Sequence, residues 1–404
     1  HAEGKEDESV ALMLEACAIV ERELASRPAA PDQAALSFLA HSYNTLSGPL
    51  AALGRQAESL ANLRRGLDIA KALAGPDPDD PEVRELHAIV YSNLGSVLST
   101  LARPAEAFEA YRAGADVLDK LVNEYPAVID YRRFHARCLS GCGDLAQALG
   151  RPEEALAYYR EARSDWQKLV DDNPALYSSP VELGNMYNRM GWLLFGLGRM
   201  DEALGQYEAA RTLYRNLIDK FPPNLVHRSR NELSNVLINI VEIQRRQGKL
   251  AEARANCDQA IALRETLIKD FPRTQTYRPR MGECLLRSGQ VKLAAGDISG
   301  AVADWRRAIA VYRTVTDRDG EYAMFEAGCH ALLASVAGRA GSGIADHERT
   351  AGLEKALKIL REIMEGGYRD PQLNIESSLD PLRARPDFRL LMRDVEFPSD
   401  PFAR

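Results

Sequence analysis

Long apolar runs are missing from this sequence. No stretch approaches the roughly 18 consecutive apolar residues of a membrane-spanning helix, so we expect no membrane span and no direct membrane contact. The first eight residues are acidic and contain neither an initiating Met nor the apolar core of a signal peptide. We therefore interpret the chain as a fragment or processed form of a longer protein. A cytoplasmic location is expected, or an extracytoplasmic one if a membrane segment lies upstream.

Cysteine is scarce, and the six cysteines lack the regular spacing of a disulfide framework. His135, Cys138 and Cys142 share one helix face, as three metal ligands would. No fourth ligand is nearby in the sequence, so we predict a packed core at this face and no metal site. The remaining histidines form no spacing typical of catalysis, and we expect no catalytic residue and no cofactor.

Positive charge is in short supply, with 51 Lys and Arg against 58 Asp and Glu. Residues 223–316 reverse this balance, because they carry 16 Lys and Arg against 9 Asp and Glu. This asymmetry predicts an acidic partner for that region. The excess is too mild, and too poor in interleaved aromatic residues, to indicate nucleic acid binding.

The sequence does contain a repeat. A marker glycine, or an Ala in its place, is followed five residues later by a small residue, and successive markers lie 48, 48, 48, 50 and 48 residues apart. The markers are Gly54, Ala102, Gly150, Gly198, Gly248 and Gly296. Self-similarity at a period of about 20 to 50 residues is typical of solenoids. The sequence therefore predicts one repeat array rather than separate globular domains.

The residues after each marker predict a helix, which we name helix B. Small residues at offsets 5 and 12 flank a bulky residue at offset 9, and these offsets share one face of a 3.6-residue helix. In the third copy they are Ala155, Tyr159 and Ala162. Pro152 takes the first helical position, where its missing N–H costs nothing.

The residues before each marker predict the partner helix, helix A. Seven residues before the marker, four of the six copies have glycine: Gly95, Gly143, Gly191 and Gly289. Glycine inside a helix costs about 1 kcal/mol relative to alanine. Its recurrence predicts that another backbone comes close at this position.

Tyr or Leu, Leu and Gly in helix A, followed by Gly, Ala, Tyr and Ala in helix B, resemble the signature of the tetratricopeptide repeat over residues 32–316. The resemblance implies an all-α superhelix, a solenoid of antiparallel helix pairs that binds proteins. The usual period is about 34 residues. The longer period here adds about two turns to each helix, so we expect taller helix pairs.

The periodicity divides the chain into four parts. Residues 1–31 follow the helix B pattern of a truncated first repeat, with Gly4 as marker, and its helix A lies upstream or has been removed. Residues 32–319 form six helix pairs, and residues 320–370 form a seventh with a mobile loop at 340–350. Residues 371–404 are expected to cap the last pair, whose apolar side is otherwise uncovered.

The C-terminal segment carries a second, narrower resemblance. Leu379 to Phe388, Leu390 to Met392 and Phe397 to Ala403 are similar to the end of the tetratricopeptide arms behind Ser/Thr protein kinase domains of planctomycete bacteria. In that family the arm recruits partners or substrates. The 404 residues contain no kinase glycine loop, His-Arg-Asp loop or Asp-Phe-Gly motif. The resemblance thus implies that the catalytic domain lies outside this chain.

The tetratricopeptide resemblance also implies a binding wall, formed by helix A positions 13, 10, 6, 3 and 2 residues before each marker. In the fourth copy these positions hold Asn185, Asn188, Trp192 and Phe195. An aromatic surface beside amide groups suits a peptide with an apolar anchor. The alternative is that Trp192 packs against the neighbouring helix pair.

Charged residues take the same positions in two other copies. The fifth copy has Asn235, Glu242, Arg245 and Arg246, and the third has Arg137 and Asp144. Arginine holds carboxylates through paired hydrogen bonds, although exposed charge is more often only a solvated face.

These patterns predict a non-catalytic scaffold that binds a protein or peptide partner of acidic character, as the recruitment arm of a bacterial Ser/Thr kinase. Two alternatives remain open: a self-assembling structural arm, and a free-standing adaptor without a kinase. We expect a monomer or weak homodimer. An enzyme would need polar groups that converge in a closed pocket, and the sequence shows no such set.

Overall fold

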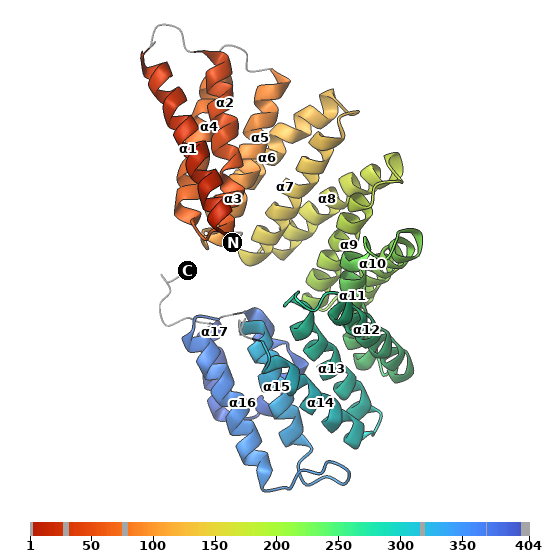
Figure 1. Cartoon of the computed structure of the whole chain (residues 1–404). Coiled ribbons are helices and arrows are strands. Elements are labelled where there is room, and N and C mark those ends of the chain that lie inside the picture. The colour runs from red at the N-terminus through yellow and green to blue at the C-terminus, as the bar shows by residue number, and fades with distance from the viewer. Residues whose placement is uncertain (1–2, 27–31, 75–79, 316–319, 369, 397–404) are drawn as a thin grey trace. The chain divides into compact units, whose positions relative to one another are not determined.

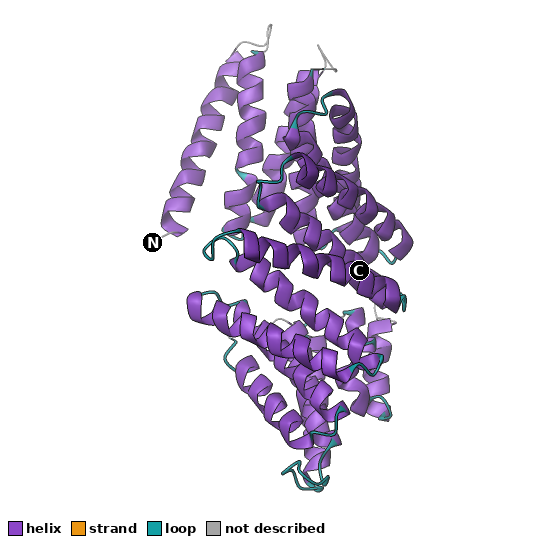
Figure 2. Ribbon diagram, turned by 90° about the vertical axis from the view of Figure 1, so that its right-hand side faces the viewer, coloured by secondary structure: helices purple, strands orange, loops and turns teal. Residues whose placement is uncertain are grey.

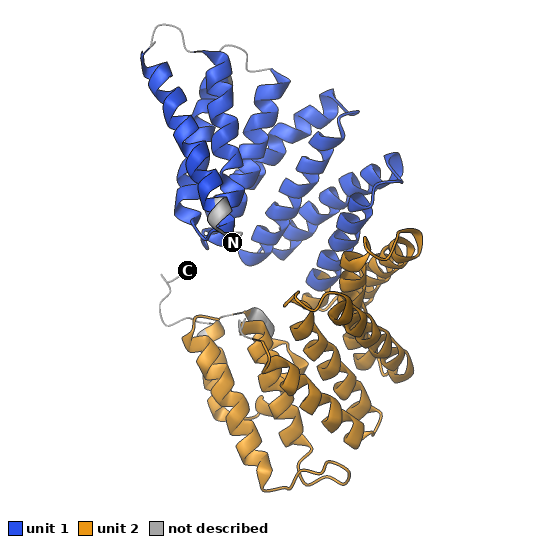
Figure 3. Ribbon diagram, viewed as in Figure 1, with its two compact units in different colours: residues 1–193 blue, residues 194–404 orange. Residues whose placement is uncertain are grey.

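The computed structural model describes residues 3–26, 32–74, 80–315, 320–368 and 370–396 (Figure 1). Every regular element in these ranges is a helix (Figure 2), which confirms the predicted all-α, tetratricopeptide-like solenoid. None of the helices in the described part is long and apolar enough to cross a membrane. The chain divides into two compact units, residues 1–193 and 194–404 (Figure 3).

The helices of both units pair in antiparallel fashion along the chain. Those of the first unit are α1 (Glu3–Ser26), α2 (Gln33–Thr45), α3 (Ser47–Ala52), α4 (Gln56–Ala74), α5 (Pro81–Thr100), α6 (Pro104–Glu124), α7 (Ile129–Ala148), α8 (Pro152–Asp172) and most of α9 (Ser178–Gly196). Those of the second are α10 (Met200–Lys220), α11 (His227–Arg246), α12 (Leu250–Asp270), α13 (Tyr277–Ala294), α14 (Ile298–Tyr312), α15 (Gly320–Ser335), α16 (Glu348–Glu365), the 3₁₀ helices η1 (Pro371–Asn374) and η2 (Ser377–Leu382), and α17 (Pro386–Glu396).

The marker residue ends helix A by adopting a left-handed backbone. All five marker glycines have φ between +72° and +84°, and Ala102 adopts φ +54° in their place. The N–H of Arg151, one residue past Gly150, donates to the carbonyl of Ala146 at 2.8 Å, which satisfies a free end of helix A. Glycine is favoured because a side chain strains this backbone.

The glycines inside helix A accommodate an aromatic ring. A Cβ at Gly95 would lie 2.7 Å from the ring of Tyr111, and a Cβ at Gly143 or Gly289 would collide with Tyr159 or Trp305. The expected approach of another backbone at this position is therefore wrong, because the ring at offset 9 of helix B fills the space. The backbone approaches closely at offset 12 instead, where a Cβ on Gly114 would meet the Ala88 carbonyl at 3.3 Å.

The helices have the extra length that the period predicts. In the second and third copies, helix A has 20 residues and helix B has 21. The first copy differs, because its helix A is divided into α2 and α3 at Leu46, three residues before Pro49. Gly4 lies inside α1 rather than before it, so it is not a marker of the left-handed type.

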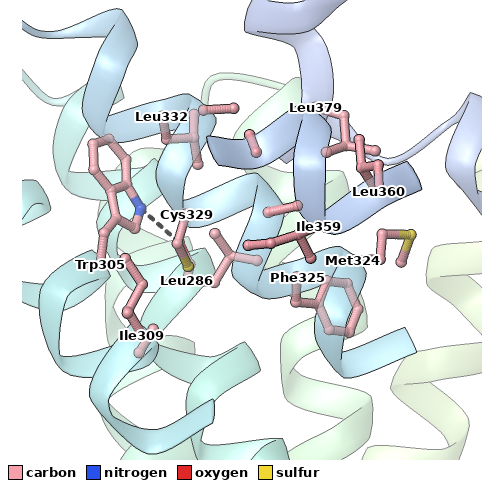
Figure 4. Close-up of a cluster of buried hydrophobic side chains, with 14 of the residues drawn as sticks. Leu286, Trp305, Ile309, Met324, Phe325, Cys329, Leu332, Ile359, Leu360 and Leu379 are labelled. Atoms are coloured by element: carbon pink, nitrogen blue, oxygen red, sulfur yellow. Dashed lines mark hydrogen bonds between the residues drawn. The ribbon is translucent and has the colours of Figure 1, made fainter. Parts of the chain in front are cut away.

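The last helix pair is closed by the C-terminal segment. Leu373, Leu379, Leu382 and Phe388 join the core that Trp305 and α15 form (Figure 4). The connection between α15 and α16 is held by a hydrogen bond from the Gly338 N–H to the Ile344 carbonyl at 2.9 Å, and its mobility stays a prediction. Phe397 and Phe402, on which part of the kinase-arm resemblance depends, lie outside the described residues.

Candidate functional site

The helix-A face is the surface formed by helix A at 13, 10, 6, 3 and 2 residues before each marker. In the first unit, α7 and α9 contribute adjacent strips of this face. Arg189 of α9 pairs with Asp144 of α7, and the Ser140 hydroxyl donates to the Met186 sulfur at 3.2 Å. Asp144 also accepts a hydrogen bond from the Tyr159 hydroxyl at 2.7 Å. This carboxylate therefore stabilises the contact between repeats.

Arg137 and Trp192 leave more of their surface to solvent. Arg137 is exposed, and its guanidinium lies 5.9 Å from the Phe134 ring centre. Within the described ranges it forms no ion pair. Trp192 has 36% of its surface exposed. Asn185 and Asn188 beside it are half-buried, and the Asn185 amide donates to Glu182 at 3.0 Å.

On the second unit, three predicted residues of α11 form one charge cluster. Arg245 donates two hydrogen bonds to the buried Glu242, at 3.1 and 2.9 Å, and Arg246 donates a third at 2.7 Å. Burial disfavours the charged form of Glu242, but Arg287, Arg245 and Arg246 outweigh it and hold the pKa of this carboxyl below its usual value. Two arginines share one carboxylate, so the cluster keeps an excess positive charge.

Phe195 and Asn235 have different roles beside this cluster. The Arg246 guanidinium lies 5.0 Å from the Phe195 ring centre, within range of a cation–π contact. Asn235 faces its own helix pair, because its carbonyl oxygen accepts from the buried Arg264 and its amide donates to Glu232 at 3.1 Å. The structure thus places Phe195 with the arginines and uses Asn235 internally.

The helix-A face of α13 and α15 already holds an extended segment of the same chain. Arg287 donates to both carboxylate oxygens of Glu376, at 2.8 and 2.7 Å, and the Gln290 amide donates to the Ser377 hydroxyl at 3.1 Å. Gly328 of α15 leaves room for the Ser378 side chain. Sequence reasoning missed this contact, although Gly328, ten residues before the left-handed Gly338, was an available signal.

Glu376 is a fully committed anion. Its side chain and that of Arg287 are 7% and 9% exposed. Burial opposes ionisation most strongly, yet Arg287 and the hydrogen bond from the Ser378 N–H lower the pKa of Glu376 to about 2. An arginine of helix A therefore binds a carboxylate from an extended segment in this fold.

Arginines near the starts of the A helices are largely neutralised. Arg84 and Arg230 pair with acids at the ends of their own B helices, at 2.6 and 3.9 Å. Arg132 pairs with Asp165 at 3.4 Å, and Arg280 bridges Glu283 and Glu321. Their contacts favour the interpretation that these arginines oppose acidic groups rather than extend a basic wall.

His135 and the cysteines are engaged in packing. The His135 Nδ1 lies 2.7 Å from an Asp165 oxygen, and Cys138 and Cys142 are buried free thiols. Burial raises the pKa of the Cys138 thiol to about 11, which disfavours the thiolate that a metal requires.

Comparisons with known proteins agree with this architecture. Residues 39–82, 135–175 and 189–224 match family models described as the tetratricopeptide repeat. The chain carries tetratricopeptide repeats. This repeat is typically a non-catalytic, protein-binding fold. A search of the curated proteins finds no match.

Two solved structures are similar to the chain at low sequence identity. RapI in its apo form is 11% identical, with a TM-score of 0.61 over 98% of this chain and 96% of its own. A signal-transduction ATPase with a tetratricopeptide repeat sensor, from Pyrococcus horikoshii, is 12% identical, with a TM-score of 0.51 over 81% of this chain and 45% of its own. At these identities the similarity shows the fold alone.

Proposed function

We propose that this chain is a non-catalytic scaffold that binds an extended, acidic peptide of a protein partner along the helix-A face. The observation that carries the proposal is the segment at Glu376 to Leu379, which lies on α13 and α15 through a bidentate arginine–carboxylate pair. A partner peptide would use the same chemistry on repeats that this segment does not cover.

The acid-binding position of the second unit is the pair Arg245 and Arg246. Their side chains are 22% and 33% exposed, and they share only the Glu242 carboxylate and the Phe195 ring. A carboxylate from a partner would neutralise the excess charge through paired hydrogen bonds. The binding should therefore weaken as salt is raised.

The first unit supplies a second position, with Trp192 as the apolar anchor. Trp192 stands on α9, and Arg137 stands on the adjacent strip of α7. Ideal helix geometry places these positions roughly 15 Å apart, given about 10 Å between neighbouring helices and seven residues of axial rise. A peptide with an acidic and an apolar residue about four positions apart would reach both.

The test is a displayed library of random 12-residue peptides selected on the full chain. We expect acidic peptides whose binding falls at least tenfold in Arg245→Ala/Arg246→Ala. The matched control is Arg306→Ala/Arg307→Ala, which removes the same charge from the exposed face of α14. Equal losses in both variants, or selection without acidic enrichment, would overturn the proposed mode. Trp192→Ala should weaken the peptides that bind the first unit and leave the melting temperature nearly unchanged.

We also propose that the scaffold is the recruitment arm of a Ser/Thr kinase. The support is the resemblance of the segment from Leu379 to Met392 to the end of such arms. An immunoblot of source cells with an antibody against this chain tests it. A band far above 44.7 kDa that mass spectrometry finds to include kinase motifs supports the arm, and a band near that mass leaves a free-standing adaptor.

A further inference from the structure

The first helix of the chain exposes a face that the other repeats cover. In the complete repeats, offset 5 of helix B is fully buried, as at Ala107, Ala155 and Ala203. Offset 8 is buried as well, at 5% exposure for Ala110 and 4% for Asp304. The helix that covers these offsets is the A helix of the same pair.

Side-chain contacts confirm which neighbour faces each offset. Asp304, at offset 8 of α14, accepts from Ser288 and Lys292 of α13, at 2.7 and 2.6 Å. Asp165, at offset 15 of α8, meets Arg132 and His135 of α7. Offsets 8 and 15 therefore point at the A helix that precedes helix B.

The helix α1 follows the same register but has no such partner among the described residues. Val10 and Cys17, at offsets 6 and 13 from Gly4, are buried against α2. Leu12 and Ile19, at offsets 8 and 15, are 62% and 48% exposed. The side that packs on the next repeat is filled, and the side that takes helix A is open.

A third exposed residue faces the same position from α2. Residues nine before a marker reach the preceding A helix, because the Asn93 amide donates to Asn44 at 2.8 Å and Arg189 pairs with Asp144. Phe38 lies seven residues, or two turns, before the equivalent position on α2. It is 47% exposed, whereas its counterpart Leu86 on α5 is 2% exposed.

Leu12, Ile19 and Phe38 thus line one open helix position beside α1 and α2. We propose that this surface is a second protein-binding site, which takes an amphipathic α-helix in the helix A register. The bound helix carries apolar residues against Leu12 and Ile19, and a small residue opposite Met13, since Gly95 and Gly143 stand opposite the offset-9 residue elsewhere. A second copy fits less well, because three side chains per copy offer far less than the roughly 800 Å² per partner of a stable dimer.

This site is separate from the helix-A face and recognises a different chemistry. The helix-A face takes an extended acidic peptide through arginine, and the α1 surface takes a helix by apolar packing. Binding at α1 should be insensitive to Arg245→Ala/Arg246→Ala, so each proposal can fail without the other.

The test uses a fluorescent peptide with the sequence of α5, residues 81–100, as a surrogate helix A. Its anisotropy is titrated with the full chain, and we expect saturable binding that weakens at least tenfold in Leu12→Asp and in Phe38→Asp. The control is Leu390→Asp on α17, where a leucine of similar exposure, 66%, is replaced far along the chain. A peptide with the helix B sequence of α6, residues 104–124, should not compete.

Three results would overturn the proposal. The α5 peptide fails to bind, or it binds Leu12→Asp as tightly as the unchanged chain. Alternatively, sedimentation reveals a dimer that Leu12→Asp dissociates, which assigns the surface to a second copy. Circular dichroism of each variant verifies that the helices remain, and the high exposure of Leu12 and Phe38 makes loss of folding an unexpected result.

Discussion

Removal of the Glu376 carboxylate should destabilise the second unit strongly. In Glu376→Ala, the Arg287 guanidinium loses two hydrogen bonds of 2.8 and 2.7 Å and remains buried. Breaking a buried ion pair from one side costs about 3–5 kcal/mol, because the remaining charge has no compensation. We expect a loss in this range in the free energy of unfolding of the second unit.

Tryptophan fluorescence can report on this unit alone. The chain has three Trp residues, and Trp305 is fully buried in the second unit while Trp166 and Trp192 belong to the first. In a background with Trp166→Phe and Trp192→Phe, urea unfolding followed at Trp305 gives the stability of the second unit.

The double variant Arg287→Leu/Glu376→Leu separates the pair from its surroundings. It should lose less stability than Glu376→Ala, because no unpaired charge is left. A loss below about 1 kcal/mol in Glu376→Ala would refute the reasoning. So would a double variant whose cost is the sum of the two single substitutions, since additivity means no coupling.

Three further predictions concern pH and the two special glycine positions. Glu376 has a folded pKa of about 2, below its unfolded value, so its stabilisation is present above about pH 4.5 and is lost as the pH falls towards 2; the urea midpoint at Trp305 should drop over this range, whereas an unchanged midpoint would contradict it. Ala102→Gly should raise stability by about 1 kcal/mol and Gly150→Ala should lower it similarly, as thermal unfolding would measure. Gly143→Ala should cost about 1–3 kcal/mol through its collision with Tyr159, and Tyr159→Leu should recover part of the loss.

Local signals in the sequence were sufficient to predict the helix pairs. The marker glycines are needed within a few residues of the turn that they form, so their spacing gives the period directly. The ring-in-glycine packing was also present in the sequence as matched sizes, because Gly143 and Gly289 accompany Tyr159 and Trp305, whereas Val241 accompanies the small Cys257. We expected a backbone there because only one side of the contact was considered.

The contacts of the C-terminal segment could not be read from periodicity. Glu376 lies 89 residues from Arg287, and neither belongs to a pattern that links them. The cluster of Glu242, Arg245 and Arg246 was closer to prediction, since spacings of three and four residues join side chains on a helix. Their mutual hydrogen bonds mean that a partner meets a preformed group rather than separate charges.

The buried cysteines give the chain its own set of reporters for local opening. All six are free thiols hidden from solvent, located on α1, α7, α12, α13 and α15. A thiol reagent can therefore label each site only when its helix pair separates. Because neighbouring repeats hold one another mainly through nearest-neighbour contacts, the order of labelling would reveal whether the repeats fray one at a time or each unit opens as a whole.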